Sequence, residues 1–155
     1  MKFDPTRSTP SGYWRFAAEY ALAAQAVQTS VPRAVAPALQ LHGQAIELAL
    51  KSFLLKRGER IEDVEALRHK LTDILRTARS RRLGTVVKLD NEELAIINLL
   101  SKSYVKHRFR YIVTGITVVP DINSLSALTE KLVVGLEEYC TGKKWGLGRI
   151  ARQQT

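Results

Sequence analysis

The stretch from Leu41 to Gly58, LHGQAIELALKSFLLKRG, decides the fold that we expect, because it carries the most apolar helical pattern of the chain. Ile46, Leu50 and Phe53 recur at the spacing of one helical face, and leucines repeat on a second face. A helix that is apolar over most of its circumference needs neighbours on most sides. The sequence therefore predicts a central helix on which the other elements pack.

One polar stripe interrupts this apolar surface. Gln40, Gln44, Glu47 and Lys51 follow one another at intervals of four, three and four residues, so they stack on one helical face. In one interpretation Glu47 and Lys51 form an ordinary ion pair at the solvated edge of the helix. In the other, the stripe is half buried between helices and its charges face a ligand groove or a second subunit. The sequence leaves both interpretations open.

Apolar residues at helical spacing predict further helices on both sides of the central one. These helices cover residues 13–28, 71–82, 90–111 and 121–139, whereas residues 59–68 fit either a short helix or a turn. The sequence shows no alternating strand series and no internal repeat. We therefore expect an all-α fold, an up-and-down antiparallel bundle of four to five helices.

Capping residues predict where several of these helices begin and end. Asp90 and Glu93 form a capping box, and Asp121 is placed to cap the last helix. Gly58 fits the position just past the end of the central helix. Pro37 either kinks that helix or marks its true start, because an interior proline removes a hydrogen bond and clashes with the preceding turn.

Length and composition limit the class of protein. The 155 residues suit one domain, which we divide into a flexible arm (1–12), the helical bundle (13–141) and a basic flexible tail (142–155). Cys140 is the single cysteine, which excludes an internal disulfide and a thiolate zinc cluster. The sequence shows neither a signal peptide nor a membrane-spanning run, so we expect a cytoplasmic protein that does not contact membranes.

The charge balance favours anionic partners. With 24 Lys and Arg against 15 Asp and Glu, the formal net charge is +9. Such a balance is typical of proteins that meet polyanions or acidic proteins, but it does not identify the anion. Motifs that identify a catalytic or nucleotide-binding mechanism, such as a Walker loop or HExxH, are absent from the sequence. We expect no cofactor.

The three histidines lie on separate segments, so their spacing predicts no metal site. His42 lies on an apolar face, and we expect it to be a hydrogen-bonded histidine at the core or its edge. His69 fits the start of a helix.

The densest candidate site is the segment YVKHRFRY at residues 104–111, which combines cations, an imidazole and three aromatic rings. Arg108 and Arg110 offer bidentate contacts to phosphate, and Tyr104 or Tyr111 offers a ring on which a base can stack. In a helix, Tyr104 and Arg108 share one face. The alternative is a helix end whose cations complement the helix dipole.

Four features together resemble the HEPN domain superfamily over roughly residues 13–140. They are Tyr13-Trp14 before an alanine-rich helix, Glu47 to Lys51, His69-Lys-Leu71, and Arg108 to Tyr111. The resemblance implies a helical bundle that is usually dimeric and binds a nucleotide or RNA. It also implies a place in prokaryotic defence or toxin–antitoxin systems, beside a nucleotidyltransferase.

Many members of that superfamily are metal-independent ribonucleases with an arginine four to six residues before a histidine. This chain departs from the pattern, since its nearest approach is Lys102 before His107, and lysine lacks the planar fork of arginine. We therefore predict a non-catalytic module that forms a homodimer and binds a nucleotide or RNA. The expected ligand-binding residues are Glu47, Lys51, Tyr104, Arg108, Arg110 and Tyr111, with Glu47 orienting the arginines.

Two alternatives remain. One is a degenerate ribonuclease in which His107 is the general acid–base and Lys102 stabilises the phosphate charge. The other is an interaction module for an acidic partner such as a nucleotidyltransferase.

Overall fold

The structure is a computed structural model, and it describes residues 8–109 and 118–144. Within these residues the chain forms six α-helices and one 3₁₀ turn, with no strand. The all-α bundle predicted from the sequence is confirmed, and the additional helix, α3, falls in the segment that the sequence left ambiguous. The elements are α1 (Pro10–Ser30), α2 (Val35–Lys56), α3 (Ile61–Ala66), α4 (Leu71–Ser80), η2 (Leu83–Thr85), α5 (Asn91–Tyr104) and α6 (Ile122–Thr141).

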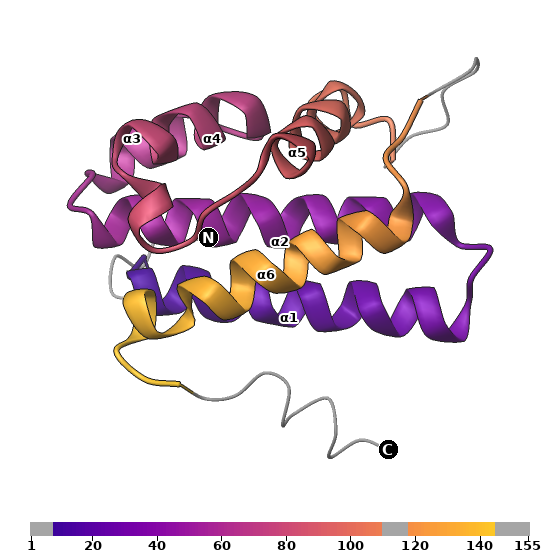
Figure 1. The fold of residues 1–155 in the computed structure, drawn as a ribbon, viewed down its shortest axis with the longest axis horizontal. Coiled ribbons are helices and arrows are strands. Elements are labelled where there is room, and N and C mark those ends of the chain that lie inside the picture. The colour runs from indigo at the N-terminus through magenta and orange to yellow at the C-terminus, as the bar shows by residue number, and fades with distance from the viewer. Residues whose placement is uncertain (1–7, 110–117, 145–155) are drawn as a thin grey trace, which may run out of the picture.

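The predicted central helix is α2. Figure 1 shows α2 crossing the middle of the molecule, with α1 and α6 on one side and α3, α4 and α5 on the other. Its core-facing side chains include Ile46, Leu50 and Phe53, none of which is exposed to solvent. The bundle therefore has two layers that share α2, and a polar side chain on the α4 and α5 side of α2 lies between helices.

The first helix lies antiparallel to α2 and α6. Ser52 Oγ donates to the carbonyl of Pro10 at 2.6 Å, which places the start of α1 beside the end of α2. Trp14 Nε1 donates to the carbonyl of Val133 on α6 at 2.8 Å. Small residues such as Ala17 and Ala24 are buried without any exposed surface, so α1 packs closely on its neighbours.

Two helices begin at positions that the sequence patterns did not fix. The first starts at Pro10 and not at residue 13, because Thr9 caps it by accepting a hydrogen bond from the Gly12 amide at 3.0 Å. A proline in the first turn loses no helical hydrogen bond. The central helix starts at Val35, so Pro37 lies in its first turn and marks the start of the helix.

Three predicted caps are confirmed. Asp90 Oδ1 accepts from the Glu93 amide at 2.8 Å while Glu93 Oε2 accepts from the Asp90 amide at 3.1 Å, which completes the capping box. Asp121 Oδ2 accepts from the Ser124 amide at 2.9 Å. Gly58, just past α2, has a φ of +96°, a conformation that favours glycine.

The predicted extent of α5 is wrong at its C-terminal end. The helix stops at Tyr104 and does not continue through His107 and Arg108, because His107 adopts a left-handed φ of 54°. The amide of Arg108 donates to the Ser103 carbonyl at 3.0 Å, and that of His107 donates to the Tyr104 carbonyl at 3.0 Å. This pairing is a Schellman motif with histidine in the place where glycine is usual.

In the part of the chain that the structure describes, no helix is both long enough and apolar enough to pass through a bilayer.

Candidate functional site

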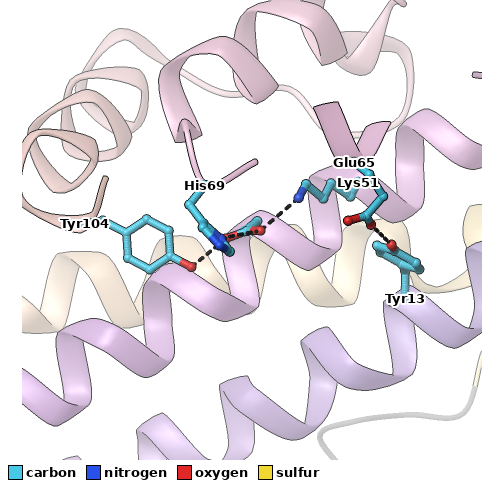
Figure 2. A network of polar contacts seen from close by, with 6 residues as sticks. Tyr13, Lys51, Glu65, His69 and Tyr104 are labelled. Carbon is cyan, nitrogen blue, oxygen red and sulfur yellow. Dashed lines mark hydrogen bonds and ion pairs between the residues drawn. The ribbon is translucent and has the colours of Figure 1, made fainter. Parts of the chain in front are cut away.

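Glu47, near the middle of α2, is the centre of a polar network, and its partners Lys51, His69 and Tyr104 are labelled in Figure 2. Its carboxylate accepts from Lys51 Nζ at 2.9 Å, from the Tyr104 hydroxyl at 2.6 Å, and from His69 Nδ1 at 2.9 and 3.0 Å. The side chains of Glu47 and Lys51 are each 4% exposed. One carboxylate thus joins α2, the end of α5 and the segment before α4.

The burial of this pair decides between the two interpretations of the polar stripe. An ion pair at a solvated edge is excluded, because both side chains lie between helices. Removing a carboxylate and an ammonium from water costs several kcal/mol each unless other groups compensate them. Here three donors surround Glu47, and one of them, Lys51, also carries the opposite charge, which satisfies that requirement.

Gly43 allows Tyr104 to reach this carboxylate. A Cβ atom on Gly43 would lie 2.5 Å from Tyr104 Cδ2, so only glycine lets the ring pack against α2 at this point. The residue Tyr104 is 2% exposed, and its ring belongs to the core. The predicted role of Tyr104 as a stacking platform for a base is therefore wrong, because its ring is buried in the core and its hydroxyl donates to Glu47.

His69 connects the buried network to the surface. It lies between α3 and α4, its side chain is 46% exposed, and its Nδ1 donates to Glu47. A carboxylate at Nδ1 fixes the proton on that nitrogen and orients the ring. The centroid of the His107 ring lies 5.7 Å away at an interplanar angle of 73°. Two imidazoles from different segments therefore lie side by side.

Both imidazoles line a surface pocket of about 470 Å³. This volume lies within the range of roughly 300–1,000 Å³ that is usual for small-molecule sites. The pocket has a polar wall of charged and amide side chains and an apolar contribution from α1 and α2. Its lining residues are Tyr13, Gln44, Glu47, Leu48, Lys51, Glu65, Arg68, His69 and His107.

A hydrogen bond between α1 and α3 lies at this pocket. The Tyr13 hydroxyl, from the first turns of α1, donates to Glu65 Oε1 of α3 (Figure 2). Burial, followed by the hydrogen bond and the negative charge of Glu65, raises the pKa of the Tyr13 hydroxyl above its ordinary value. Tyr13 is therefore a neutral donor at ordinary pH.

The charges that face the pocket are not all available to a ligand. Lys51 is engaged by Glu47, so these two formal charges cancel. Arg68 is exposed at the pocket wall and has a left-handed φ of 50°. Residues with such backbone angles gather at functional sites, where the surrounding structure imposes the strain. Arg68, His69 and His107 are the groups best placed to meet an anion.

The residues predicted for the site fall into three groups. Glu47 and Lys51 line the pocket, and His107 lies there too. Arg108 follows His107 in the turn after α5 and is partly buried. Lys102 is exposed on α5 and is not among the residues that line the pocket.

Arg110 and Tyr111 lie outside the described residues, as do the predicted arm up to residue 7 and the tail from residue 145. Glu47 was expected to orient arginines. Its hydrogen bonds are instead with Lys51, His69 and Tyr104, because Tyr104 and His69 approach the carboxylate from α5 and from the segment before α4.

Sequence reasoning missed His69, Arg68, Tyr13 and Glu65 as pocket residues. His69 lies 22 residues from Glu47, and Tyr13 lies 52 residues from Glu65. No spacing rule predicts such contacts, because they depend on how the helices pack. Gln44, another pocket residue, belongs to the polar stripe of α2, and Tyr13 and His69 belong to the features that resemble the HEPN superfamily, but none of these signals indicated a shared pocket.

The third histidine is part of the core, as expected. His42 Nδ1 lies 3.0 Å from Thr129 Oγ1 of α6, and Nε2 lies 2.6 Å from Gln28 Oε1 of α1. Burial lowers the pKa of His42 to about 4. Across residues 8–109 and 118–144, no group of three or more His, Cys, Asp or Glu side chains is arranged to hold a metal ion.

Comparisons of the chain with protein-family models, with curated proteins and with solved structures found no match. The side chains of the pocket are therefore the basis for a functional assignment.

Proposed function

We propose that this protein is a HEPN-like helical bundle that binds a nucleotide or single-stranded RNA, with one phosphate in the pocket between α2, α3 and the turn after α5. The observation that carries the proposal is the pair of imidazoles, His69 and His107, on the wall that also holds Arg68. Imidazole and guanidinium N–H groups are strong donors to phosphate oxygens.

The formal charges that line the pocket balance, with Glu47 and Glu65 against Lys51 and Arg68. Lys51 compensates the buried charge of Glu47, and the Tyr13 hydroxyl engages Glu65. The neutral Tyr13 hydroxyl leaves the negative charge of Glu65 in place, so we place the phosphate against Arg68 and the two imidazoles. Tyr13 and Leu48 supply apolar surface for the base or sugar.

The proposal is tested with an end-labelled single-stranded RNA incubated with the pure protein without metal, and resolved on native and denaturing gels. The wild type should shift the RNA, and His69→Gln and Arg68→Gln should each weaken the shift. Glutamine at position 69 retains a donor for Glu47, which protects the fold. Arg33→Gln, in the exposed connection between α1 and α2, removes a charge away from the pocket and is the matched control. Equal binding by all four proteins would refute the pocket as the site.

A second function, metal-independent cleavage of RNA, is favoured by the same 5.7 Å approach of the two histidine rings. One imidazole would accept the proton of a 2′-hydroxyl as its oxygen attacks phosphorus, and the other would donate a proton to the departing 5′-oxygen. The products would be a 2′,3′-cyclic phosphate and a new 5′-hydroxyl. In this candidate His69 is the partner of His107 in place of Lys102.

The denaturing gel separates the two functions. Shifted but intact RNA supports binding alone. Cleavage in the presence of a chelator that both His107→Ala and His69→Gln abolish supports the nuclease. Cleavage that survives both substitutions comes from a contaminant or another site.

A further inference from the structure

The solvent face of α4 and its flanking residues carries a run of cations that begins at the pocket. Helix α4 is strongly amphipathic, with Leu71, Ile74, Leu75 and Ala78 buried. Between residues 68 and 82 there is a single acidic residue, Asp73, against six cations. These cations are Arg68, Lys70, Arg76, Arg79, Arg81 and Arg82, and all of them are exposed.

Four of the six cations have no acidic partner in the described part of the chain. Arg76 pairs with Asp73 at 3.0 Å, and Arg81 pairs with Glu59. Arg68, Lys70, Arg79 and Arg82 form no ion pair within residues 8–109 and 118–144. Their charges are available to an external anion.

Complementing the helix dipole explains only part of this arrangement. Arg79, Arg81 and Arg82 lie at the C-terminal end of α4, where cations are favourable. Arg68 and Lys70 precede the N-terminus, where the positive end of the dipole disfavours them. Cations at both ends of the helix, including the end where the dipole disfavours them, therefore favour an anion outside the fold.

The far end of the run is held in place by α2. Arg57 donates from Nη2 to the Arg82 carbonyl at 3.3 Å and to Thr85 Oγ1 at 3.0 Å. The Arg57 guanidinium lies 5.3 Å from the centroid of the Phe53 ring and 5.4 Å from that of Tyr139. These contacts fix the backbone at Arg82, so the cations at this end of the run extend from a backbone that is held before binding.

We infer that this face of α4, defined by Arg68, Lys70, Arg76, Arg79, Arg81 and Arg82, is a track for the phosphate backbone of a single-stranded nucleic acid that enters the pocket. The inference rests on the proposed function and makes the ligand a strand and not a mononucleotide. A ten-residue helix is about 15 Å long. At roughly 3.4 Å per nucleotide of a stacked strand, the track spans about four nucleotides beyond the pocket.

The test measures binding of end-labelled oligouridylates of two and twelve nucleotides by fluorescence anisotropy at several salt concentrations. The track variant is Arg79→Gln/Arg82→Gln. The control, Arg15→Gln/Arg33→Gln, removes the same charge from exposed positions on α1 and in the following connection. Loss of two phosphate contacts should reduce the slope of log affinity against log salt by about 1.4 for the twelve-nucleotide strand.

The expected result is weaker binding of the long strand by the track variant only, with dinucleotide affinity unchanged. If the track variant and the control lose the same affinity, or if long and short strands bind wild type with the same salt slope, the track is refuted. His69→Gln distinguishes the two proposals, since it should weaken both oligonucleotides. If His69→Gln binds like wild type while the track variant binds the long strand more weakly, the pocket is refuted and the track stands. If His69→Gln binds more weakly while the track variant binds like wild type, the track alone is refuted. Absence of binding by wild type would refute both.

Discussion

The imidazole of His69 and the carboxylate of Glu47 meet across 22 residues of sequence, with Nδ1 2.9 Å from one carboxylate oxygen and 3.0 Å from the other. This contact joins the most buried helix of the bundle to the wall of its pocket. Since Glu47 is 3% exposed and the side chain of His69 is 46% exposed, the fold fixes the carboxylate and the carboxylate in turn fixes the imidazole. The stability of the bundle and the geometry of the site are therefore coupled at Glu47.

Replacing Glu47 with leucine should destabilise the protein strongly. The substitution leaves the Lys51 ammonium buried without its counter-charge, which typically costs about 3–5 kcal/mol. Urea unfolding monitored by circular dichroism at pH 7 measures the loss. The double variant Glu47→Leu/Lys51→Met should regain most of it, because well-packed apolar residues replace a buried ion pair at little cost. A double variant as unstable as the single one would show that the loss comes from Tyr104 and His69 and not from the stranded ammonium.

Replacing Gly43 with alanine should destabilise the bundle despite the higher helix propensity of alanine. The new methyl group would lie 2.5 Å from the Tyr104 ring and would push it away from Glu47. Overpacking of this kind costs roughly 1–3 kcal/mol, against a propensity gain of about 1 kcal/mol. Thermal and urea unfolding measure the difference. Gly84→Ala is the matched control, because a Cβ atom on Gly84 would meet nothing within 4 Å, and it should stay within about 0.5 kcal/mol of wild type.

Replacing His107 with glycine should separate stability from function. At a φ of 54°, glycine avoids the strain that a side chain imposes, whereas alanine retains it. We expect His107→Gly to be more stable than His107→Ala by about 1 kcal/mol, while both lose the imidazole and bind RNA more weakly. Urea unfolding and the gel shift measure the two effects. Equal stability of the two variants would show that the turn after α5 does not depend on this backbone angle.

Much of the fold could be predicted because its signals are local. The apolar faces of Leu41 to Gly58 predicted the central helix, and the short-range pairing of Asp90 with Glu93 predicted the start of α5. The end of α5 could not be predicted in the same way. The chain leaves that helix through a left-handed residue, and a histidine at this position carries no signal of the kind that glycine gives.

The contacts of the candidate site could be predicted only where the residues share one helix. Glu47 and Lys51 are one turn apart, so their pairing was visible, although whether they are buried was not. The approach of His69 to His107 depends on the packing of the segment before α4 against the turn after α5. No pattern in either segment predicts that the two meet, so their contact is a property of the tertiary structure alone.

Acidification should destabilise the fold through His42, whose imidazole is buried between α1, α2 and α6 with Gln28 and Thr129 as partners. Burial lowers its pKa to about 4 in the folded protein, from an ordinary value of 6.5. The unfolded chain therefore binds a proton that the folded chain excludes as the pH falls from about 6.5 to about 4. Stability that is fully present above pH 6.5 should decline across this window by up to roughly 3 kcal/mol.

The measurement is urea unfolding of wild type and His42→Gln from pH 7.5 to pH 4.5. Because both proteins keep the other titrating groups, their difference isolates His42, and it should shrink as the pH falls. A difference independent of pH would mean that the pKa of His42 is the same in the folded and the unfolded chain. A difference that grows as the pH falls would mean that His42 is protonated in the core, where it would donate to both Gln28 and Thr129.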